Sequence, residues 1–365
     1  MKRIVIKIGS SSLVKDGVLD EARLNTLINE IALLREKDCK AVIVTSGAVA
    51  IGAYTLGCKP KDISMKQACA AVGQAILMNG YKSVCDKYGF KCAQILVSHD
   101  DFENRKRMLN LENTLNTLID NDVIPIINEN DALAVEEIMV GDNDTLSALI
   151  APMAEADMLV LLSDIDGLYT DNPKINKDAK LIKRVEAITP EIKAMAHPSS
   201  TSVGTGGMET KIKAAIICAT SGIDMIIQNA DKLDRLHQAF SEDFEGTIFV
   251  TKKRIDARSQ WILFKTRPTG TIMIDKGCHE AILDRKSLLA SGIIDASGSF
   301  EAGDVVNITF DGRIIAKGIS EFSDYDLLKI KGHMSKEYSR ILGHSSKSYV
   351  CHANNIVVME GNDYE

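Results

Sequence analysis

Short, nearly continuous apolar runs that alternate with longer amphipathic stretches constrain the fold of this chain more than any other feature. The apolar runs lie at residues 3–8, 40–46, 93–98, 123–128, 158–164 and 224–229. Runs of this kind are typical of strands buried on both faces of a parallel sheet. The amphipathic stretches lie at residues 21–37, 66–88, 109–120 and 208–221. The alternation predicts βαβ units and an α/β fold, an open αβα sandwich around a mostly parallel sheet.

The pattern changes after about residue 245, where helical stretches become scarcer. Short strand-like segments separated by Gly, Asp and Asn follow, and the pair Asp311-Gly312 predicts a hairpin turn. We therefore expect an α/β domain at 1–250, a linker at 251–268, a small and mainly β domain at 269–350 and a C-terminal tail at 351–365. A chain of 365 residues exceeds the usual size of one hydrophobic core, in agreement with two domains.

Charge and composition exclude several functions. The formal net charge is −7, which argues against a protein whose main task is to hold nucleic acid. No segment approaches the ~20 consecutive apolar residues of a membrane span. The eight cysteines form no CxxC pair and the histidines lack metal-ligand spacing, so we expect free thiols and no zinc site. The chain is predicted to be soluble and cytoplasmic.

Polar clusters follow several of the predicted strands, and in a parallel sheet they meet at one edge. After the first strand, Gly9 and Ser10 form a Gly-Ser turn whose backbone N–H groups suit an anion. Lys7 lies within that strand, where a charge has two interpretations. It serves the anion site, or it is a lysine at a strand end whose stem is buried and whose ammonium group reaches water. The sequence lacks GxxxxGK[ST] and has no GxGxxG after the first strand, so it is not a P-loop protein and a dinucleotide fold is disfavoured.

Three further polar clusters are predicted to lie at the same edge of the sheet. The turn with Ser46, Gly47 and Ala48 would by itself be read as a helix cap. The segment 128–131 suits a ligand with an ammonium group, which Asp131 can pair with while the amides bind a carboxylate. The segment 141–144 places two acids at a helix start, where they favour the helix dipole and are common as plain caps.

Two segments are harder to explain as scaffold. The turn 163–170 follows a buried strand and begins with Ser163 and Asp164. The Gly-rich segment 204–211 opens an apolar helix and carries Lys211 one turn into it, after a small, polar stretch. A loop of this composition, with a lysine behind it, can grip and release a nucleotide phosphate.

Several longer motifs carry a family resemblance. VTSGAVAIG, INENDALAVEEIMVGDNDTLSALIA, LLSDIDGLYTDNP and GTGGMETK occur in the order and approximate spacing of the glutamate 5-kinases. The chain resembles this branch of the amino acid kinase family along essentially its whole length, and NEND followed by VGDND is the most specific match. The second unit, with IDKGCHEAIL, SLLASGI, GSFEAGDVV and GRIIAKGI, resembles the PUA domain. The resemblance implies the amino acid kinase fold with a PUA-like domain.

The resemblance also implies roles for individual positions. Lys7 and Lys211 would bracket the transferring phosphoryl group, with Asp144 holding both as the third catalytic residue. The implied substrate-binding residues are Ser46, Gly47, Ala48, Asn128, Asp131 and Asn143. The implied ATP-binding residues are Lys7, Gly9, Ser10, Ser163, Asp164, Thr205, Gly206, Gly207, Met208, Glu209, Thr210 and Lys211. The pair Ile165-Asp166 departs slightly from the family pattern without affecting these roles.

The implied reaction transfers the γ-phosphate of ATP to the side-chain carboxylate of L-glutamate, with Mg²⁺ held mainly by the ATP phosphates rather than by the protein. A glutamate carboxylate has a pKa near ~4.3 and is ionised at neutral pH, so no general base is required. The resemblance further implies the first step of proline synthesis, feedback inhibition by proline, a homo-oligomer (dimer or tetramer) and the next pathway enzyme as a partner to test.

Alternatives remain at this point. Relatives of the same fold phosphorylate aspartate, acetylglutamate, carbamate or nucleoside monophosphates. PUA domains usually accompany RNA-binding or RNA-modifying enzymes, but residues 269–365 contain 10 Lys+Arg and 14 Asp+Glu, a poor composition for binding phosphate. A catalytically inactive amino acid sensor is disfavoured because Lys7, Asp144 and Lys211 are all present.

Overall fold

The computed structural model describes residues 1–133, 142–173, 175–195, 207–251, 259, 262, 268–344 and 346–359. The chain divides into two compact units, Met1–Arg254 and Ile255–Glu365. Each unit has its own hydrophobic core and is described here by itself.

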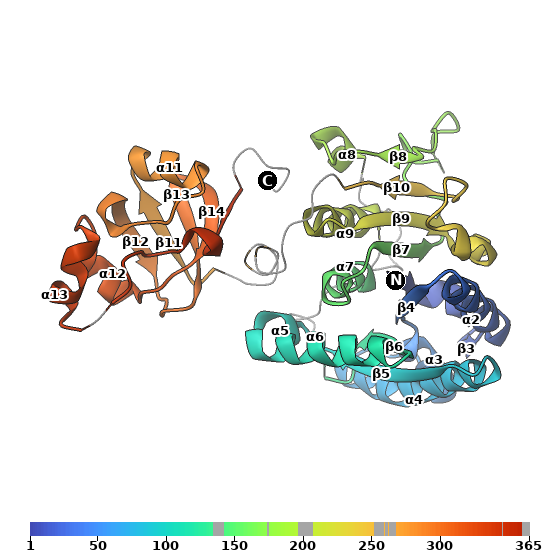
Figure 1. The fold of residues 1–365 in the computed structure, drawn as a ribbon. Coiled ribbons are helices and arrows are strands. Elements are labelled where there is room, and N and C mark those ends of the chain that lie inside the picture. Colours follow the sequence, from blue (N-terminus) through green and yellow to red (C-terminus); the bar gives the residue numbers. More distant parts are fainter. Residues whose placement is uncertain are drawn as a thin grey trace. The chain divides into compact units, whose positions relative to one another are not determined.

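The first unit is built on an eight-stranded sheet with the strand order β5-β6-β4-β1-β7-β9-β10-β8 (Figure 1). Its strands are β1 (Lys2–Ile8), β4 (Cys39–Val44), β5 (Lys91–Val97), β6 (Val123–Glu129), β7 (Met158–Ser163), β8 (Arg184–Val185), β9 (Asp224–Asn229) and β10 (Thr247–Phe249). Each of the neighbouring pairs from β5 to β9 is parallel, and β10 runs antiparallel to β9. The prediction of a mostly parallel sheet is confirmed.

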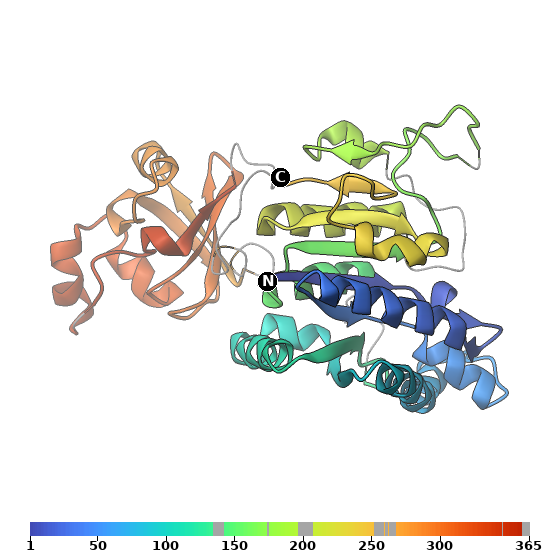
Figure 2. The ribbon, with the colours of Figure 1, turned by 45° about the vertical axis from the view of Figure 1, so that its right-hand side comes forward.

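Helices cover both faces of this sheet (Figures 1 and 2). One face packs against α2 (Glu21–Glu36), α4 (Ile63–Lys87) and η1 (Ala230–Gln238), which share a core with Ile4, Ile6 and Ile8 of β1. The opposite face carries α6 (Arg105–Asp120), α7 (Asn143–Met153) and α9 (Met208–Ser221). Shorter helices connect these elements: α1 (Ser10–Leu13), α3 (Ala48–Thr55), α5 (His99–Glu103) and α8 (Pro190–Ala194).

Local sequence signals explain where the long helices begin. Asp20 caps α2 by accepting a hydrogen bond from the N–H of Arg23, and Asp62 caps α4 by accepting one from the N–H of Met65. Within α2, the apolar residues recur every three or four positions and are buried against the sheet. The helices expected at 21–37, 66–88, 109–120 and 208–221 are all present. The small hairpin formed by β2 (Val14–Lys15) and β3 (Val18–Leu19) was not predicted.

The second unit is mainly β, as predicted, and contains a five-stranded sheet with the order β12-β11-β13-β14-β15. Its strands are β11 (Gly270–Ile274), β12 (Ile293–Gly298), β13 (Val305–Phe310), β14 (Arg313–Ile319) and β15 (Ile356–Val358). Its helices are α11 (Lys276–Leu283), η2 (Ala290–Gly292), α12 (Asp324–Ile330), η3 (Ser335–Glu337), α13 (Tyr338–Leu342) and η4 (Ala353–Asn355).

Two sequence predictions about this unit can be compared with the structure. Asp311 and Gly312 have φ angles of 48° and 75° between the antiparallel strands β13 and β14, which confirms the hairpin turn. The predicted boundary at residue 350 is too early, because β15 pairs with β14 and lies in the expected tail 351–365. Of the expected linker 251–268, the structure describes residues 251, 259, 262 and 268. Every helix in the described residues falls short of the length or apolar character of a membrane span.

Candidate active site

The strand order brings the predicted site segments to one edge of the first sheet. β1 lies at the centre, with β4 and β6 on one side and β7 and β9 on the other, all parallel. The turns after these strands therefore open at the same, carboxyl edge. Since the chain places its next strands first on one side of β1 and then on the other, a crevice at this point is where ligands bind in open α/β sheets.

A carboxylate shared by two lysines forms the centre of this edge. Asp144 Oδ1 lies 2.6 Å from Lys7 Nζ, and Asp144 Oδ2 lies 3.0 Å from Lys211 Nζ. Side chains alternate along β1, so Lys7 points away from the face occupied by Ile6 and Ile8 and towards α7. Asp144 is the second residue of α7, and Lys211 lies one turn into the neighbouring helix α9. The three catalytic residues implied by the resemblance are thus brought together.

These charges are shielded from water. The exposed fraction of the side chain is 1% for Asp144, 4% for Lys211 and 12% for Lys7. Burial alone would raise the pKa of Asp144, but the charges of Lys7 and Lys211 outweigh it and hold the pKa of Asp144 below its usual value. The hydroxyl of Thr210 lies 3.1 Å from Asp144 Oδ2 and 2.8 Å from the backbone oxygen of Gly207, so these two acceptors share its single proton. Two ammonium groups on one ionised carboxylate leave a net positive charge, which suits an anionic ligand.

The other acid at the start of α7 has a different role. Asp142 is the N-cap of the helix and accepts hydrogen bonds from the backbone N–H of Thr145 at 2.8 Å and from its hydroxyl at 3.0 Å. Burial raises the pKa of Asp142, and the negative charge of Asp144 raises it further. The cap interpretation of this segment is therefore correct for Asp142, whereas Asp144 pairs with lysines outside its own helix.

A chain of amides links the predicted substrate-binding residues. Asn143 Nδ2 donates to the backbone oxygen of Thr45 at 2.6 Å and to Asn128 Oδ1 at 3.3 Å. Asn128 Nδ2 in turn donates to Gln74 Oε1 at 2.8 Å. The hydroxyl of Tyr81 donates to Thr45 Oγ1 at 2.9 Å in the protein interior. The ends of β4 and β6 are thereby fixed to α4 and α7.

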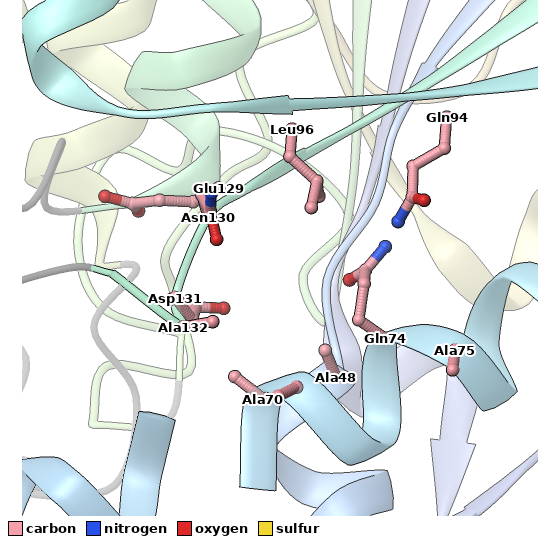
Figure 3. A pocket seen from close by; sticks show the side chains of 11 residues that line it. Ala48, Ala70, Gln74, Ala75, Gln94, Leu96, Glu129, Asn130, Asp131 and Ala132 are labelled. Atoms are coloured by element: carbon pink, nitrogen blue, oxygen red, sulfur yellow. The ribbon is translucent and has the colours of Figure 1, made fainter. Parts of the chain in front are cut away.

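A cavity of about 260 Å³ adjoins this chain of amides (Figure 3). It is lined by Ala48, Ala70, Ala71, Gln74, Ala75, Gln94, Leu96, Glu129, Asn130, Asp131 and Ala132. Figure 3 shows the amides of Gln74 and Gln94 on one wall and the carboxylate of Asp131 on the other. Gln74 Nε2 is buried and has no hydrogen-bond partner among the residues that the structure describes. A small cavity with such convergent polar groups suits a small polar ligand.

Asp131 is electrostatically frustrated in this cavity. Burial raises the pKa of its carboxyl to about 6, and the negative charge of Glu129 contributes in the same direction. An ammonium group in the cavity would remove this penalty, because it stabilises the ionised carboxylate. The preference for an ammonium ligand, inferred from the sequence 128–131, thus acquires a physical basis.

Gly47 joins the cavity to the turn after β1. It has a φ angle of 110°, and a Cβ atom at this position would lie 2.8 Å from Val14 Cγ2 and 3.6 Å from the Cβ of Ser10. Only glycine fits here without strain. Ser46, Gly47 and Ala48 therefore lie between the cavity, which Ala48 lines, and the turn that holds Gly9 and Ser10.

The predicted nucleotide residues lie on the other side of β1. Ser163 ends β7, and its hydroxyl donates to Asp164 Oδ1 at 3.1 Å, with Asp164 exposed. Gly207 is the N-cap of α9, and Met208, Glu209 and Thr210 form its first turn. Thr205 and Gly206, like most of the Gly-rich stretch before them, lie outside the described residues.

The sequence analysis missed several polar residues of the site, among them Gln74, Gln94, Tyr81 and Thr45. Gln74 and Tyr81 lie inside the long helix α4, where a polar residue at a helical spacing resembles any solvent-facing position. Thr45 lies within the motif VTSGAVAIG, but no role was predicted for it. Among the described residues, no group of three or more His, Cys, Asp or Glu side chains could hold a metal ion.

The site thus combines a buried, lysine-flanked carboxylate at the carboxyl edge of a parallel sheet with a small polar cavity, an arrangement that suits a small anionic ligand. Residues 2–229 match the model of the amino acid kinase family, and residues 270–342 match that of the PUA domain. The chain therefore belongs to the amino acid kinase family.

Individual relatives refine this placement. The chain is 42% identical to a glutamate 5-kinase of Methanosarcina barkeri over 99% of its own length and 97% of the relative's. It is 43% identical to a glutamate 5-kinase of Carboxydothermus hydrogenoformans over 99% and 98%. Among solved structures, a carbamate kinase from Giardia lamblia bound to AMP-PNP aligns with a TM-score of 0.50 at 18% identity, covering 69% of this chain and 99% of the other. That likeness concerns the fold alone.

Proposed function

We propose that this protein transfers the γ-phosphate of ATP to the side-chain carboxylate of L-glutamate and so forms L-glutamyl 5-phosphate. The observation that carries the proposal is the pairing of Lys7 and Lys211 with one buried carboxylate, Asp144, at the sheet edge beside a cavity that favours an ammonium group. The near-full-length similarity to proteins named glutamate 5-kinase supports the choice of acceptor.

The chemistry follows from charge. The acceptor carboxylate is already ionised at neutral pH, so the protein does not have to remove a proton from it. It has to bring two anions together, align them in line and stabilise the charge on the transferring group. Lys7 and Lys211 supply two positive charges for this purpose. Asp144 holds both ammonium groups at distances of 3.0 Å or less, which fixes them before the substrates arrive.

Mg²⁺ would accompany the nucleotide. Both carboxylate oxygens of Asp144 already contact a lysine ammonium group, so a divalent ion fits on the phosphate oxygens of ATP rather than on this carboxylate. When bound there, the ion neutralises charge on the phosphates. The protein's contribution to the same end comes from Gly9 and Ser10 after β1 and from the first turn of α9.

Substrate recognition is assigned to the other side of β1. Asp131 would pair with the glutamate ammonium group. The hydroxyl of Ser46 and the backbone N–H of Asn143, the first residue of α7, would bind its carboxylates, because both hydrogens of the Asn143 side-chain amide are directed at Thr45 and Asn128. Asn128 and Gln74 would hold Asn143 in place through the chain of amides. Ser163 and Asp164, at the end of β7, would contact the nucleotide.

The same site accounts for the proposed regulation. L-glutamyl 5-phosphate is the product of the first step of proline synthesis, and proline retains an α-carboxylate and an amine that the cavity would accept. We expect the segment of Gly47 and Ala48 to take part in proline inhibition, because Ala48 lines the cavity. Inhibition by proline that is identical in wild type and Ala48→Val would remove this part of the proposal. A cytoplasmic homo-oligomer, dimer or tetramer, and contact with the next pathway enzyme belong to the same hypothesis.

The direct test is ADP release in the presence of Mg²⁺ and ATP. We expect turnover that depends on L-glutamate and is suppressed by proline. Equal turnover with aspartate, acetylglutamate or carbamate as acceptor would keep the phosphoryl-transfer centre but change the substrate.

A second candidate function, RNA binding, is raised by the PUA match at residues 270–342. The acidic composition of residues 269–365 argues against it, because phosphate binding requires a basic surface. We assign this domain a structural or regulatory role. Retention of RNA by the full chain that weakens steeply with salt would contradict this assignment.

A further inference from the structure

Two cysteines meet where α3 and α4 are joined. Cys58 lies in the connection between the helices, and Cys69 lies in the second turn of α4. Their Sγ atoms are 3.6 Å apart, and both thiols are free. Cys69 is fully buried, whereas Cys58 is partly exposed. The pair thus combines a thiol that a solute can reach with a second thiol directly behind it.

We propose that Cys58 and Cys69 are an oxidant-responsive dithiol that closes to a reversible disulfide and fastens α3 to α4. With a peroxide as oxidant, the sulfur of Cys58 attacks one peroxide oxygen, which yields a sulfenic acid and one water. The sulfur of Cys69 then attacks the sulfenic sulfur and releases the second water. The two thiols lose two electrons and two protons, and hydrogen peroxide is reduced to two water molecules. A dithiol reductant reverses the reaction.

The order of the two steps follows from the surroundings of each sulfur. Burial raises the pKa of the Cys69 thiol, and its contact with Cys58 raises it further. Cys69 is shielded from solution, so it does not meet the oxidant first and takes the second, resolving position, where it loses its proton as its sulfur attacks the sulfenic sulfur. Cys58 is the sulfur that an oxidant in solution meets first.

The backbone can accommodate the bond. A disulfide has an S–S distance of about 2.05 Å, so the two sulfurs have to approach each other by about 1.5 Å. The connecting residues 56–62 are mostly exposed and lie outside any helix, so they can absorb this movement. The helices themselves are already in backbone contact, because a Cβ on Gly52 would come within 1.8 Å of the Cys69 oxygen and one on Gly73 within 1.8 Å of the Ala48 oxygen.

The same contacts define what the disulfide does. Since α3 and α4 cannot approach more closely, the bond stabilises their junction without deforming the cavity that Ala48 and Gln74 line. Lys7, Asp144 and Lys211 lie on other elements and are unaffected. We infer that the oxidised protein is more resistant to unfolding and keeps its catalytic constants. The last part of this inference rests on the proposed kinase function.

The test uses the full chain, treated with hydrogen peroxide and then digested for peptide mapping without reduction. We expect a linked pair of peptides containing Cys58 and Cys69 that separates on reduction. The Tm should rise by roughly 5–10 °C on oxidation and return on reduction. The variant Cys58→Ser should show neither effect.

Cys92→Ser is the matched control. Cys92 is the competing thiol, because a hydrogen bond from Cys85 lowers its pKa to about 7. It lines a separate cavity with Lys82 and Lys91. This variant should still form the link between Cys58 and Cys69. A map in which Cys58 carries only a sulfinic acid, or in which Cys85–Cys92 is linked and Cys58–Cys69 is not, would overturn the proposal.

The activity readout is independent of the peptide map. ATP turnover with glutamate should stay within about twofold of the reduced protein, since the reacting groups are not displaced. A larger loss that reduction restores and that Cys58→Ser lacks would contradict the inferred role as a stabilising bond. Absence of turnover in the reduced protein would instead count against the proposed kinase function and leave the disulfide intact.

Discussion

The two sides of β1 differ in how completely their polar groups are satisfied. On the side of α7 and α9, Lys7 and Lys211 both contact the carboxylate of Asp144, and Thr210 adds a hydrogen bond. On the side of α4, Gln74 Nε2 has no hydrogen-bond partner within the described part of the chain, and burial raises the pKa of Asp131 to about 6.

This difference indicates that one part of the site is already assembled without a ligand, whereas the polar groups of the other part are satisfied only when a ligand binds. The charge centre, which consists of Lys7, Asp144 and Lys211, is assembled before any substrate arrives. It can therefore stabilise charge in the transition state without rearranging. The cavity carries an unpaired amide and an unfavourably buried carboxyl, and both are relieved only when a ligand with a carboxylate and an ammonium group enters. Changes to the charge centre should therefore act on kcat, and changes to the cavity on KM.

The largest effect is expected for Lys211→Ala. This change removes one of the two charges that we propose face the transferring phosphoryl group. We therefore expect kcat to fall by about 10²–10³, the loss seen when a charge-stabilising donor is removed from other enzymes. Steady-state kinetics should show a KM for glutamate within a few-fold of wild type. A raised KM with an unchanged kcat would place Lys211 in binding instead. Lys213→Ala, on the exposed side of the same helix, is the control.

The next largest effect is expected for Gln74→Leu. The change removes a donor for a charged carboxylate and the support of Asn128, so the KM for glutamate should rise by about 10–100-fold. The value of kcat should stay close to wild type, because the lysines are untouched. Gln67→Leu, on the same helix outside the cavity, is the control. An unchanged KM for Gln74→Leu would mean that the cavity is not the glutamate site.

The third prediction concerns pH. Asp131 must be ionised to pair with an ammonium group, and its pKa of about 6 in the free protein is raised above the ordinary 3.8. Glutamate binding is therefore strong above pH 6 and weakens as the pH falls through 6, reaching about a tenfold higher KM at pH 5 than at pH 7. Asp131→Asn should bind weakly at every pH and lose this dependence. A pH profile of KM that is identical in wild type and Asp131→Asn would contradict the role of Asp131.

The smallest effect is expected for Thr210→Val. This change removes the hydroxyl that Asp144 and the backbone oxygen of Gly207 share, and it keeps both lysines. We therefore expect kcat to fall by about fivefold, the equivalent of about 1 kcal/mol. Thr210→Ser, which keeps the hydroxyl, should restore most of the rate. A loss as large as that of Lys211→Ala would mean that the hydroxyl contacts the phosphoryl group directly.

Much of the fold could be predicted from the sequence, because it rests on local patterns. The buried strands β1, β4, β6, β7 and β9 contain nearly continuous apolar runs, and α9 begins and ends at the predicted residues. The segment of β15 has a strand-like pattern, but the sequence analysis assigned it to the C-terminal tail. Its place in the second sheet depends on its pairing with β14, which no local pattern reveals.

Some residues of the candidate site could likewise be predicted from the sequence, and others could not. Lys7 could be identified because a charge within a buried strand is unusual, and Lys211 because it lies one turn into a helix that follows a Gly-rich segment. Asp144 was identified from the family resemblance of its motif. Gln74 and Tyr81 could not, since their partners Asn128 and Thr45 lie 54 and 36 residues away. Their roles depend on the packing of α4 against the ends of β4 and β6, which only the folded chain determines.

The central claim is that a glutamate carboxylate receives the phosphoryl group at the Lys7–Asp144–Lys211 centre. The most direct measurement is to run the reaction with Mg²⁺, ATP and hydroxylamine, which converts an acyl phosphate to a hydroxamate. The account predicts hydroxamate with L-glutamate, much less with aspartate or acetylglutamate, and almost none for Lys211→Ala. ATP hydrolysis without hydroxamate from any of these acceptors would contradict it.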